Sequence, residues 1–123
     1  MQNIELYFYT NWSNIDGDGY ESDYIVSDEE HDIIVDLAKK YAAEKGTKGI
    51  DARDFTDDYF AKNAPELYKQ IEDDAKEEMM ASTLESAEDW FDEEEEECTI
   101  EEYINNYCSM GFYFTDDFLK TIV

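Results

Sequence analysis

Basic residues are scarce in this sequence. Nine Lys plus Arg stand against 34 Asp plus Glu in 123 residues, which gives a formal net charge of −25 and a pI near 4.1. Proteins that hold a phosphate backbone do so with Lys and Arg, which release the counterions of the nucleic acid. The composition therefore excludes direct binding to nucleic acid or to an anionic membrane surface.

Long apolar runs are also absent. No stretch approaches the roughly 20 apolar residues that span a bilayer. The start of the chain, MQNIELYFYT, lacks the basic region and apolar run of a signal peptide. We therefore expect a cytoplasmic protein that has no contact with membranes.

Cysteine and histidine, which often carry catalysis or metal binding, are few. Cys98 and Cys108 lie ten residues apart with no CxxC spacing, which favours free thiols over a disulfide or a metal pair. The only histidine, His31, is surrounded by acids and is expected to be solvated. The chain has no Gly-rich phosphate loop, no dinucleotide fingerprint and no metal-ligand spacing. We expect neither an enzyme nor a cofactor.

Proline is nearly absent, with one residue, and this argues against disorder. Hydrophobic residues make up 42% of the chain and aromatic residues 15%, whereas disordered acidic tails are poor in aromatics and rich in proline. A chain of this length is expected to fold as one domain over residues 1–123 and to bury roughly two-thirds of its surface.

Two strands are predicted at the start of the chain. Residues 4–11 alternate apolar and polar side chains with period two, and residues 20–26 end in the strand-like Tyr24-Ile25-Val26. The intervening Asn14 to Gly19 segment has the Asp and Gly residues of a hairpin loop. A third strand is predicted at residues 112–114.

Several helices are predicted between these strands. The first begins at the capping box of Ser27 and Glu30, buries a stripe that includes Ile33, Ile34 and Leu37, and ends at Gly46. A short helix is predicted over residues 51–62, with Phe55, Tyr59 and Phe60 facing inward.

A long amphipathic helix is predicted next, with Asn63 as N-cap and Pro65 in its first turn, running to about Asp92. The acidic run 93–97 is where it frays or bends. A second capping box, Thr99 and Glu102, starts a helix that Gly111 breaks, and residues 115–119 form a terminal helical turn. The order of elements predicts an α+β fold, with a small antiparallel sheet packed against several helices.

The Asn14 to Gly19 loop also resembles part of a calcium-binding loop. Asn14, Asp16, Asp18 and Gly19 fall at positions 1, 3, 5 and 6 of an EF-hand pattern, but position 12 is Ile25, where a bidentate Glu is required. We expect a hairpin turn, with a weak divalent-ion site built from Asp16, Asp18 and Asp23 as the alternative.

Aromatic and sulfur side chains recur at helical spacing in the second half of the chain. The simplest interpretation places them in the core, and a partner-binding groove is the alternative. They include Met79, Trp90, Phe91, Tyr103 and Tyr107.

The acids are clustered. Residues 66–102 hold 17 acids and two lysines, so more than half of the net charge lies on less than a third of the chain. If these acids occupy a third of a surface of about 6,900 Å², each has on the order of 135 Å². Duplex DNA has about 110 Å² of surface per phosphate charge. The candidate partner-binding residues are Asp73, Asp74, Glu77, Glu78, Glu85, Glu88, Asp89, Asp92, Glu93, Glu94, Glu95, Glu96, Glu97, Glu101 and Glu102.

In size, charge and α+β layout, the whole chain resembles the small acidic proteins that phages and mobile elements use as DNA mimics, among them many anti-CRISPR and anti-restriction proteins. The resemblance implies an inhibitor that acts in the cytoplasm of a bacterial host. Its partner would be a basic nucleic-acid-binding protein such as a CRISPR effector or a restriction enzyme. Three alternatives stay open: an acidic interaction module without DNA mimicry, a weak cation-binding protein, and an acidic protein that belongs to a high-salt proteome or is merely kept soluble by its charge.

Overall fold

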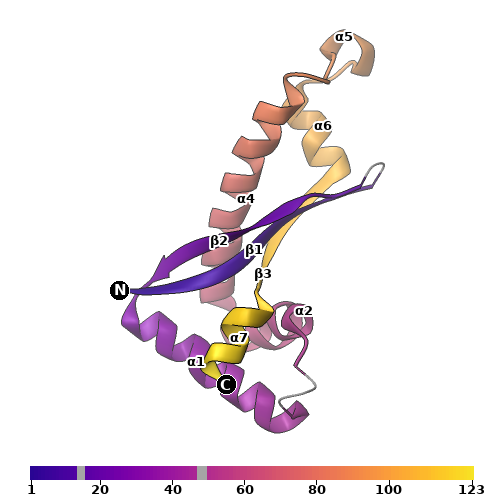
Figure 1. Ribbon diagram of the computed structural model, residues 1–123. Coiled ribbons are helices and arrows are strands. Elements are labelled where there is room, and N and C mark those ends of the chain that lie inside the picture. The colour runs from indigo at the N-terminus through magenta and orange to yellow at the C-terminus, as the bar shows by residue number, and fades with distance from the viewer. Residues whose placement is uncertain (14–15, 47–49) are drawn as a thin grey trace.

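The fold is α+β, with a small antiparallel sheet packed against helices, as the sequence predicts; the sheet has three strands in the order β2-β1-β3 (Figure 1). The computed structural model describes residues 1–13, 16–46 and 50–123. Strand β1 spans Gln2–Trp12, β2 spans Gly19–Val26 and β3 spans Cys108–Phe114. The two predicted N-terminal strands are confirmed, while residues 14 and 15 of the predicted hairpin loop lie outside the described residues.

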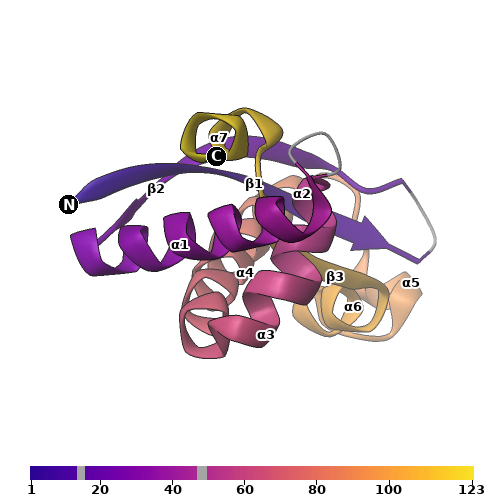
Figure 2. The ribbon, with the colours of Figure 1, turned by 90° about the horizontal axis from the view of Figure 1, so that it is seen from below.

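The alternation in β1 gives the sheet one core face and one outer face. Ile4, Leu6 and Phe8 are almost completely buried, whereas Tyr7 and Tyr9 on the opposite face are only half-buried. Helices α1 and α4 lie on the same side of the strands (Figure 2) and contribute Ile34, Ile71 and other apolar residues to the core beneath the sheet. Helices α1 and α4 thus remove the apolar residues of the strands from water on the core face, while Arg53 lies over the rings of Tyr9 and Tyr113 on the outer face.

Helix α1 spans Asp28–Lys45 and has the predicted limits. Ser27 and Glu30 form a complete capping box, and Gly46 ends the helix with a φ of 79°, a conformation that favours glycine. The prediction was wrong for Ile33, whose side chain is 44% exposed. The buried stripe instead runs through Ile34, Leu37, Ala38, Tyr41 and Ala42.

The predicted helix at residues 51–62 forms, but its middle is a π-helix. Helix α2 (Ala52–Asp54) continues into the π-helical segment Phe55–Phe60 and then into α3 (Ala61–Asn63). Phe55 and Phe60 are fully buried, as expected. Buried Thr56 donates a hydrogen bond to the Ala52 carbonyl oxygen and accepts one from the Phe114 amide. This hydroxyl ties the π-helical segment to β3.

Helix α4 spans Pro65–Ala87, with Pro65 in its first turn as predicted. Two other predictions for it were wrong. Its N-cap is Ala64 rather than Asn63, because the Asn63 side chain donates to the Tyr59 carbonyl oxygen at 2.7 Å. It ends at Ala87 rather than near Asp92, since the next three residues form a turn.

The acidic run after α4 forms a short helix rather than a frayed end. Helix α5 spans Glu93–Glu96, and the Asp92 carboxylate caps it by accepting from the amides of Glu94 and Glu95. Asp92 has an extended backbone, so it starts a new helix instead of continuing α4. Glu97 then reverses the chain in the left-handed conformation, with a φ of 58°.

Helix α6 spans Ile100–Tyr107, with Thr99 as N-cap, and passes directly into β3 at Cys108. Gly111 therefore does not break the helix, as the sequence predicted, but lies within β3 opposite Tyr9. A Cβ atom at Gly111 would come within 2.8 Å of the Tyr9 hydroxyl, so the glycine makes room for this ring. The predicted terminal turn is confirmed as α7 (Asp116–Ile122), capped by Thr115.

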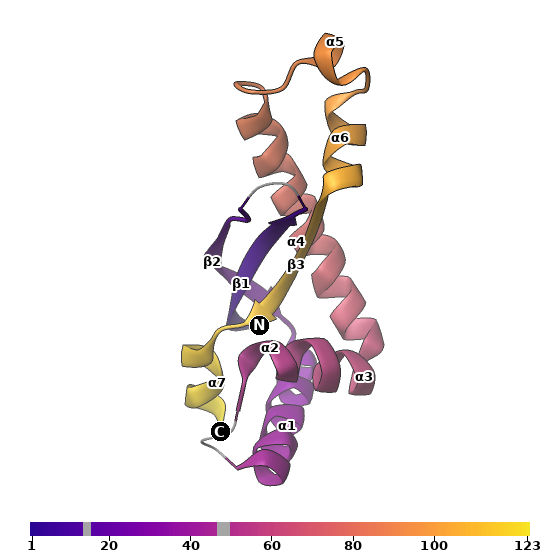
Figure 3. The same cartoon turned by 90° about the vertical axis from the view of Figure 1, so that its right-hand side faces the viewer.

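The second half of α4, with α5 and α6, extends away from α1 and from the core (Figures 1 and 3). We call residues 77–107 the acidic arm. The total accessible surface is 7717 Å², more than the roughly 6,900 Å² of a typical folded chain of this mass. Within the described ranges, no helix has the length and apolar character needed to cross a membrane.

Candidate functional site: an acidic arm and an aromatic pocket

All fifteen predicted partner-binding acids are exposed. On α4 they do not form one plane, because the helical repeat separates them into rows. Asp74, Glu78 and Glu85 follow one flank, while Asp73 and Glu77 follow the next. The remaining acids lie on the turn after α4, on α5 and in the first turn of α6, at the far end of the arm (Figure 3). The arm is thus acidic along its length and densest at its tip.

The acids nearest the core are held by internal partners. The hydroxyl of Tyr24 donates to Asp74, and that of Tyr20 donates to Glu78 at 2.9 Å, so both carboxylates join α4 to β2. Asp73 forms an ion pair with Lys69 at 3.4 Å. These three carboxylates support the structure as well as contributing charge, which the sequence pattern does not reveal.

The tyrosines in these contacts resist ionisation. Burial, together with the hydrogen bond to a carboxylate and the negative charge of that group, raises the pKa of Tyr20 and of Tyr24 to about 12. A phenolate beside Asp74 or Glu78 would lose its donated hydrogen bond and repel the carboxylate. Both hydroxyls therefore stay protonated and remain donors throughout the physiological pH range.

Farther along the arm the acids have no cationic partner. After Lys76 the sequence has no Lys, Arg or His until Lys120, while residues 77–107 hold thirteen acids. Among residues 1–13, 16–46 and 50–123, the ion pairs involve Asp28, Asp36, Glu72 and Asp73, none of which lies in the arm. Close like charges destabilise a folded chain. The arm therefore carries an uncompensated electrostatic cost.

The dimensions of α4 are close to one turn of DNA. Its 23 residues extend about 34 Å, and one turn of a duplex spans about 34–36 Å. A duplex of that length carries roughly 20 phosphate charges. Residues 66–102, which include most of α4 and the whole tip, hold 17 acids and two lysines. Only seven of these acids lie on α4 itself, and the other ten lie beyond Ala87, so the charge approaches the density of a duplex at the tip rather than along the helix.

The simplest interpretation of the sequence places the aromatic residues of the arm in the main core. The structure places them outside it. Met79 is buried, but Trp90 is 47% exposed and Tyr107 is 43% exposed. Trp90 instead packs edge-to-face on Trp12 with ring centroids 6.0 Å apart, and both rings contact Tyr103. The Ser13 amide also donates to the Tyr107 carbonyl oxygen. This second aromatic cluster attaches the arm to the end of β1.

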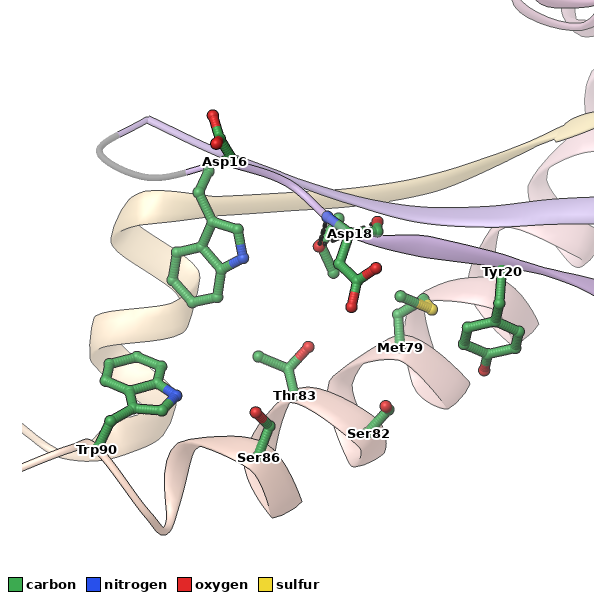
Figure 4. A pocket seen from close by; sticks show the side chains of 10 residues that line it. Asp16, Asp18, Tyr20, Met79, Ser82, Thr83, Ser86 and Trp90 are labelled. Atoms are coloured by element: carbon green, nitrogen blue, oxygen red, sulfur yellow. Dashed lines mark hydrogen bonds between the residues drawn. The ribbon is translucent and has the colours of Figure 1, made fainter.

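A pocket of about 200 Å³ lies between this cluster, the end of the hairpin and α4 (Figure 4). Trp12 and Trp90 line one end of it, and Ser82, Thr83 and Ser86 line the side formed by α4. The Asp18 carboxylate points from the hairpin toward α4, whereas that of Asp16 points away from the helix (Figure 4).

Sequence reasoning missed this pocket, although the sequence contains a signal for it. Leu67, Ile71, Ala75, Met79 and Ala87 form the buried stripe of α4, and between Met79 and Ala87 this face carries hydroxyl residues. Short hydroxyl side chains fill less space than the apolar residues of the same face, so a cavity remains beside this part of the helix. Asp18 faces this part of the helix across the pocket.

The alternative ion site is not supported. In the described part of the chain, no group of three or more His, Cys, Asp or Glu residues could hold a metal ion, and Asn14 of the predicted loop lies outside that part. One carboxylate oxygen of Asp18 accepts from the Gly19 amide at 2.7 Å. This carboxylate therefore stabilises the turn.

The two cysteines are free thiols, as predicted. Burial raises the pKa of both, and for Cys98 the negative charges of Glu102, Glu96 and Glu93 raise it further. A raised pKa keeps a thiol protonated and poorly nucleophilic. These cysteines have the character of structural residues.

Comparison with known proteins found no match among protein-family models, curated proteins or solved structures. The function is therefore inferred from the charge and geometry of this chain.

Proposed function

We propose that the protein is an inhibitor that mimics nucleic acid and blocks a nucleic-acid-binding protein. The carboxylates of the acidic arm would take the place of phosphates against Lys and Arg residues of the target. The observation that carries this proposal is the arm itself, with thirteen acids and no Lys, Arg or His within it. Solubility requires far less charge than this, since a net charge of magnitude about 2–8 is enough for a small domain.

The physical basis of inhibition is electrostatic. Charge-assisted pairs between Arg and carboxylate are among the stronger hydrogen bonds, and a field of one sign accelerates encounter with a basic cleft. The free protein bears the repulsion between its own acids, and a basic partner relieves that repulsion on binding. Neither catalysis nor a cofactor is needed.

The target class that we propose is a bacterial defence nuclease, either a CRISPR effector or a restriction enzyme. Both classes bind DNA through basic channels, and CRISPR effectors also read a short motif with arginine side chains. The arm would occupy the DNA channel or the site that reads this motif. This part of the proposal rests on the resemblance in size, charge and layout.

The first experiment is a pull-down from bacterial lysate at low salt, with and without excess duplex DNA, followed by DNA-cleavage assays on the recovered nuclease. The proposal predicts recovery of a nuclease that DNA displaces and that the protein inhibits. Recovery of a partner that DNA leaves untouched would contradict mimicry, as would indiscriminate recovery of many basic proteins.

The cleavage assay then locates the inhibitory face. In the triple variant Glu77→Lys, Glu85→Lys, Glu88→Lys, the altered acids avoid the tyrosine contacts of Asp74 and Glu78 and the cap at Asp92. We expect it to inhibit at least about tenfold less well, because each lysine would repel a basic channel.

The matched control reverses three exposed acids outside the arm: Asp32→Lys, Glu44→Lys, Asp58→Lys. Both variants change the net charge by the same amount. Equal loss of inhibition in the two would show that total charge matters rather than the arm. Thermal melting of each variant checks that it is folded.

The second candidate function is an acidic interaction module that binds a basic protein without imitating DNA. The half-exposed aromatic cluster around Trp90 and Tyr107 favours it, because aromatic side chains are common anchors at protein interfaces. Binding that tolerates salt and ignores DNA would identify this function.

A further inference from the structure

The pocket at the base of the acidic arm has features that neither a structural cavity nor a general acidic surface requires. Its α4 side is polar where the apolar stripe is interrupted between Met79 and Ala87, at Ser82, Thr83 and Ser86. In Figure 4 the side chains of these residues and of Asp18 face the same space from opposite sides. Hydrogen-bond acceptors from two separate elements thus converge on one cavity.

The end of the pocket toward the tip of the arm is aromatic. Trp12 and Trp90 meet at an interplanar angle of 75°, and both line the pocket. Tryptophan provides the best ring face for a cation, which it attracts within about 6 Å of the ring centroid. Indole rings next to carboxylates and hydroxyls form the chemical environment of a site for an organic cation.

We propose that this pocket binds the guanidinium group of an arginine side chain. Guanidinium is planar, stacks on aromatic rings and carries five N–H donors, which suit the Asp18 carboxylate and the three hydroxyls. An ammonium group is more strongly hydrated and does not stack in this way. The volume of about 200 Å³ is below the roughly 300–1,000 Å³ of typical small-molecule sites and suits one side chain.

The identity of the partner that supplies the arginine rests on the proposed function, whereas the ligand chemistry of the pocket does not. A DNA-binding target presents arginines on its basic surface, and the acidic arm would attract that surface from a distance. The pocket would then fix one arginine at the base of the arm. By holding this arginine, the pocket would add a specific contact to the general electrostatic attraction of the arm.

Intrinsic fluorescence tests the proposal directly, because both tryptophans of the chain line the pocket. The probes are N-acetyl-arginine amide, its uncharged analogue N-acetyl-citrulline amide, and N-acetyl-lysine amide, each added at constant ionic strength. We expect a saturable change with the arginine probe, with half-saturation on the order of 1–10 mM. We expect at least about fivefold weaker binding of the lysine probe and no saturation with citrulline.

Two variants connect the signal to the pocket. Asp18→Asn keeps the oxygen that caps the turn but removes the charge, and Ser82→Leu fills the cavity from the exposed surface of α4. Each should weaken binding of the arginine probe several-fold. Asp32→Asn removes one charge from α1, away from the pocket, and should leave this binding unchanged.

Nuclear magnetic resonance provides a second readout through the two indole N–H signals, which should both shift with the arginine probe. Equal binding of the arginine and lysine probes would overturn the proposal, because it would show only general attraction to the acidic surface. Unchanged arginine binding in a folded Ser82→Leu variant would overturn it as well. Either result would leave inhibition by the acidic arm intact, so the two proposals fail separately.

Discussion

At the scale of single residues, Tyr20 and Tyr24 show how this chain uses acids inside its own structure. Each lies on β2 and donates its hydroxyl proton to a carboxylate of α4. Burial and the carboxylate together raise both pKa values to about 12, compared with about 10 for a tyrosine in the unfolded chain. The two contacts hold only while the phenols stay protonated.

This difference in pKa between the folded and unfolded chain makes the folded protein less stable at alkaline pH. The unfolded chain loses the phenol protons near pH 10 and the folded chain near pH 12, so the contribution is complete below pH 10 and is lost as the pH rises from 10 to 12. We expect the variant Tyr20→Phe, Tyr24→Phe to lose about 1 kcal/mol at pH 7 and to show a shallower decline above pH 10. Urea denaturation at pH 7, 10 and 11 measures both effects.

The control is Tyr107→Phe, which removes a hydroxyl from a ring that is 43% exposed. It should follow the wild-type decline between pH 10 and pH 11. If the double variant declined as steeply as the wild type, the contacts with Asp74 and Glu78 would not be the source of the alkaline effect.

At the scale of elements, the arm depends on the aromatic cluster for its attachment. Tyr103 lies at the centre of that cluster, in contact with the rings of Trp12, Trp90, Phe91 and Tyr107. The main core ends at Met79 on α4, and beyond it this cluster, together with the buried Ala87 and Ile104, provides the apolar packing of the arm. A change at Tyr103 should loosen the arm and leave the core folded.

Tyr103→Ala tests this attachment. We expect local opening of residues 93–107 to become easier by about 2 kcal/mol, because a half-buried ring loses its contacts. Amide hydrogen exchange read by mass spectrometry should show faster exchange in α5 and α6 and unchanged exchange in α1. Tyr107→Ala, at the margin of the cluster, should have a smaller effect, and equal acceleration in α1 would mean that the whole chain had unfolded.

The elements that sequence predicts well are those whose signals are local. Ser27 and Thr99 each start a helix through a bond to a residue three positions away, so a short motif is enough. The alternation of β1 likewise predicts its buried face. Local pattern failed at the end of α4, because residues 88–92 have a helix-like composition and only the Asp92 cap and the contact of Trp90 with Trp12 show that the helix has ended.

For the candidate site, sequence predicts the amount of charge but not its arrangement. Counting residues locates the acidic segment, and all fifteen acids are indeed exposed. That Asp74 and Glu78 bind tyrosines depends on how α4 is rotated against β2, which is a tertiary property. The pocket requires Trp12 and Trp90 to meet, and these residues lie far apart in the sequence.

At the scale of the whole molecule, the net charge of −25 should affect folding and binding in opposite ways. Repulsion among the acids destabilises the compact state, and attraction to a basic partner depends on the same acids. At about 10 mM ionic strength the screening length is about 30 Å, and near 150 mM it is about 8 Å. Over this range, repulsion between acids of the arm that lie more than about 8 Å apart becomes largely screened.

We therefore expect added salt to stabilise the protein while it weakens inhibition. The melting temperature should rise by several degrees from about 10 mM to about 150 mM NaCl, and association with a nuclease target should slow by at least about tenfold over the same range. KCl should act as NaCl does, because screening does not depend on the identity of the ion. If the melting temperature stayed constant while association slowed, the acids would repel one another too weakly for binding to relieve that repulsion. If both were insensitive to salt, the acidic arm would not be the binding surface, and the aromatic cluster would become the leading candidate.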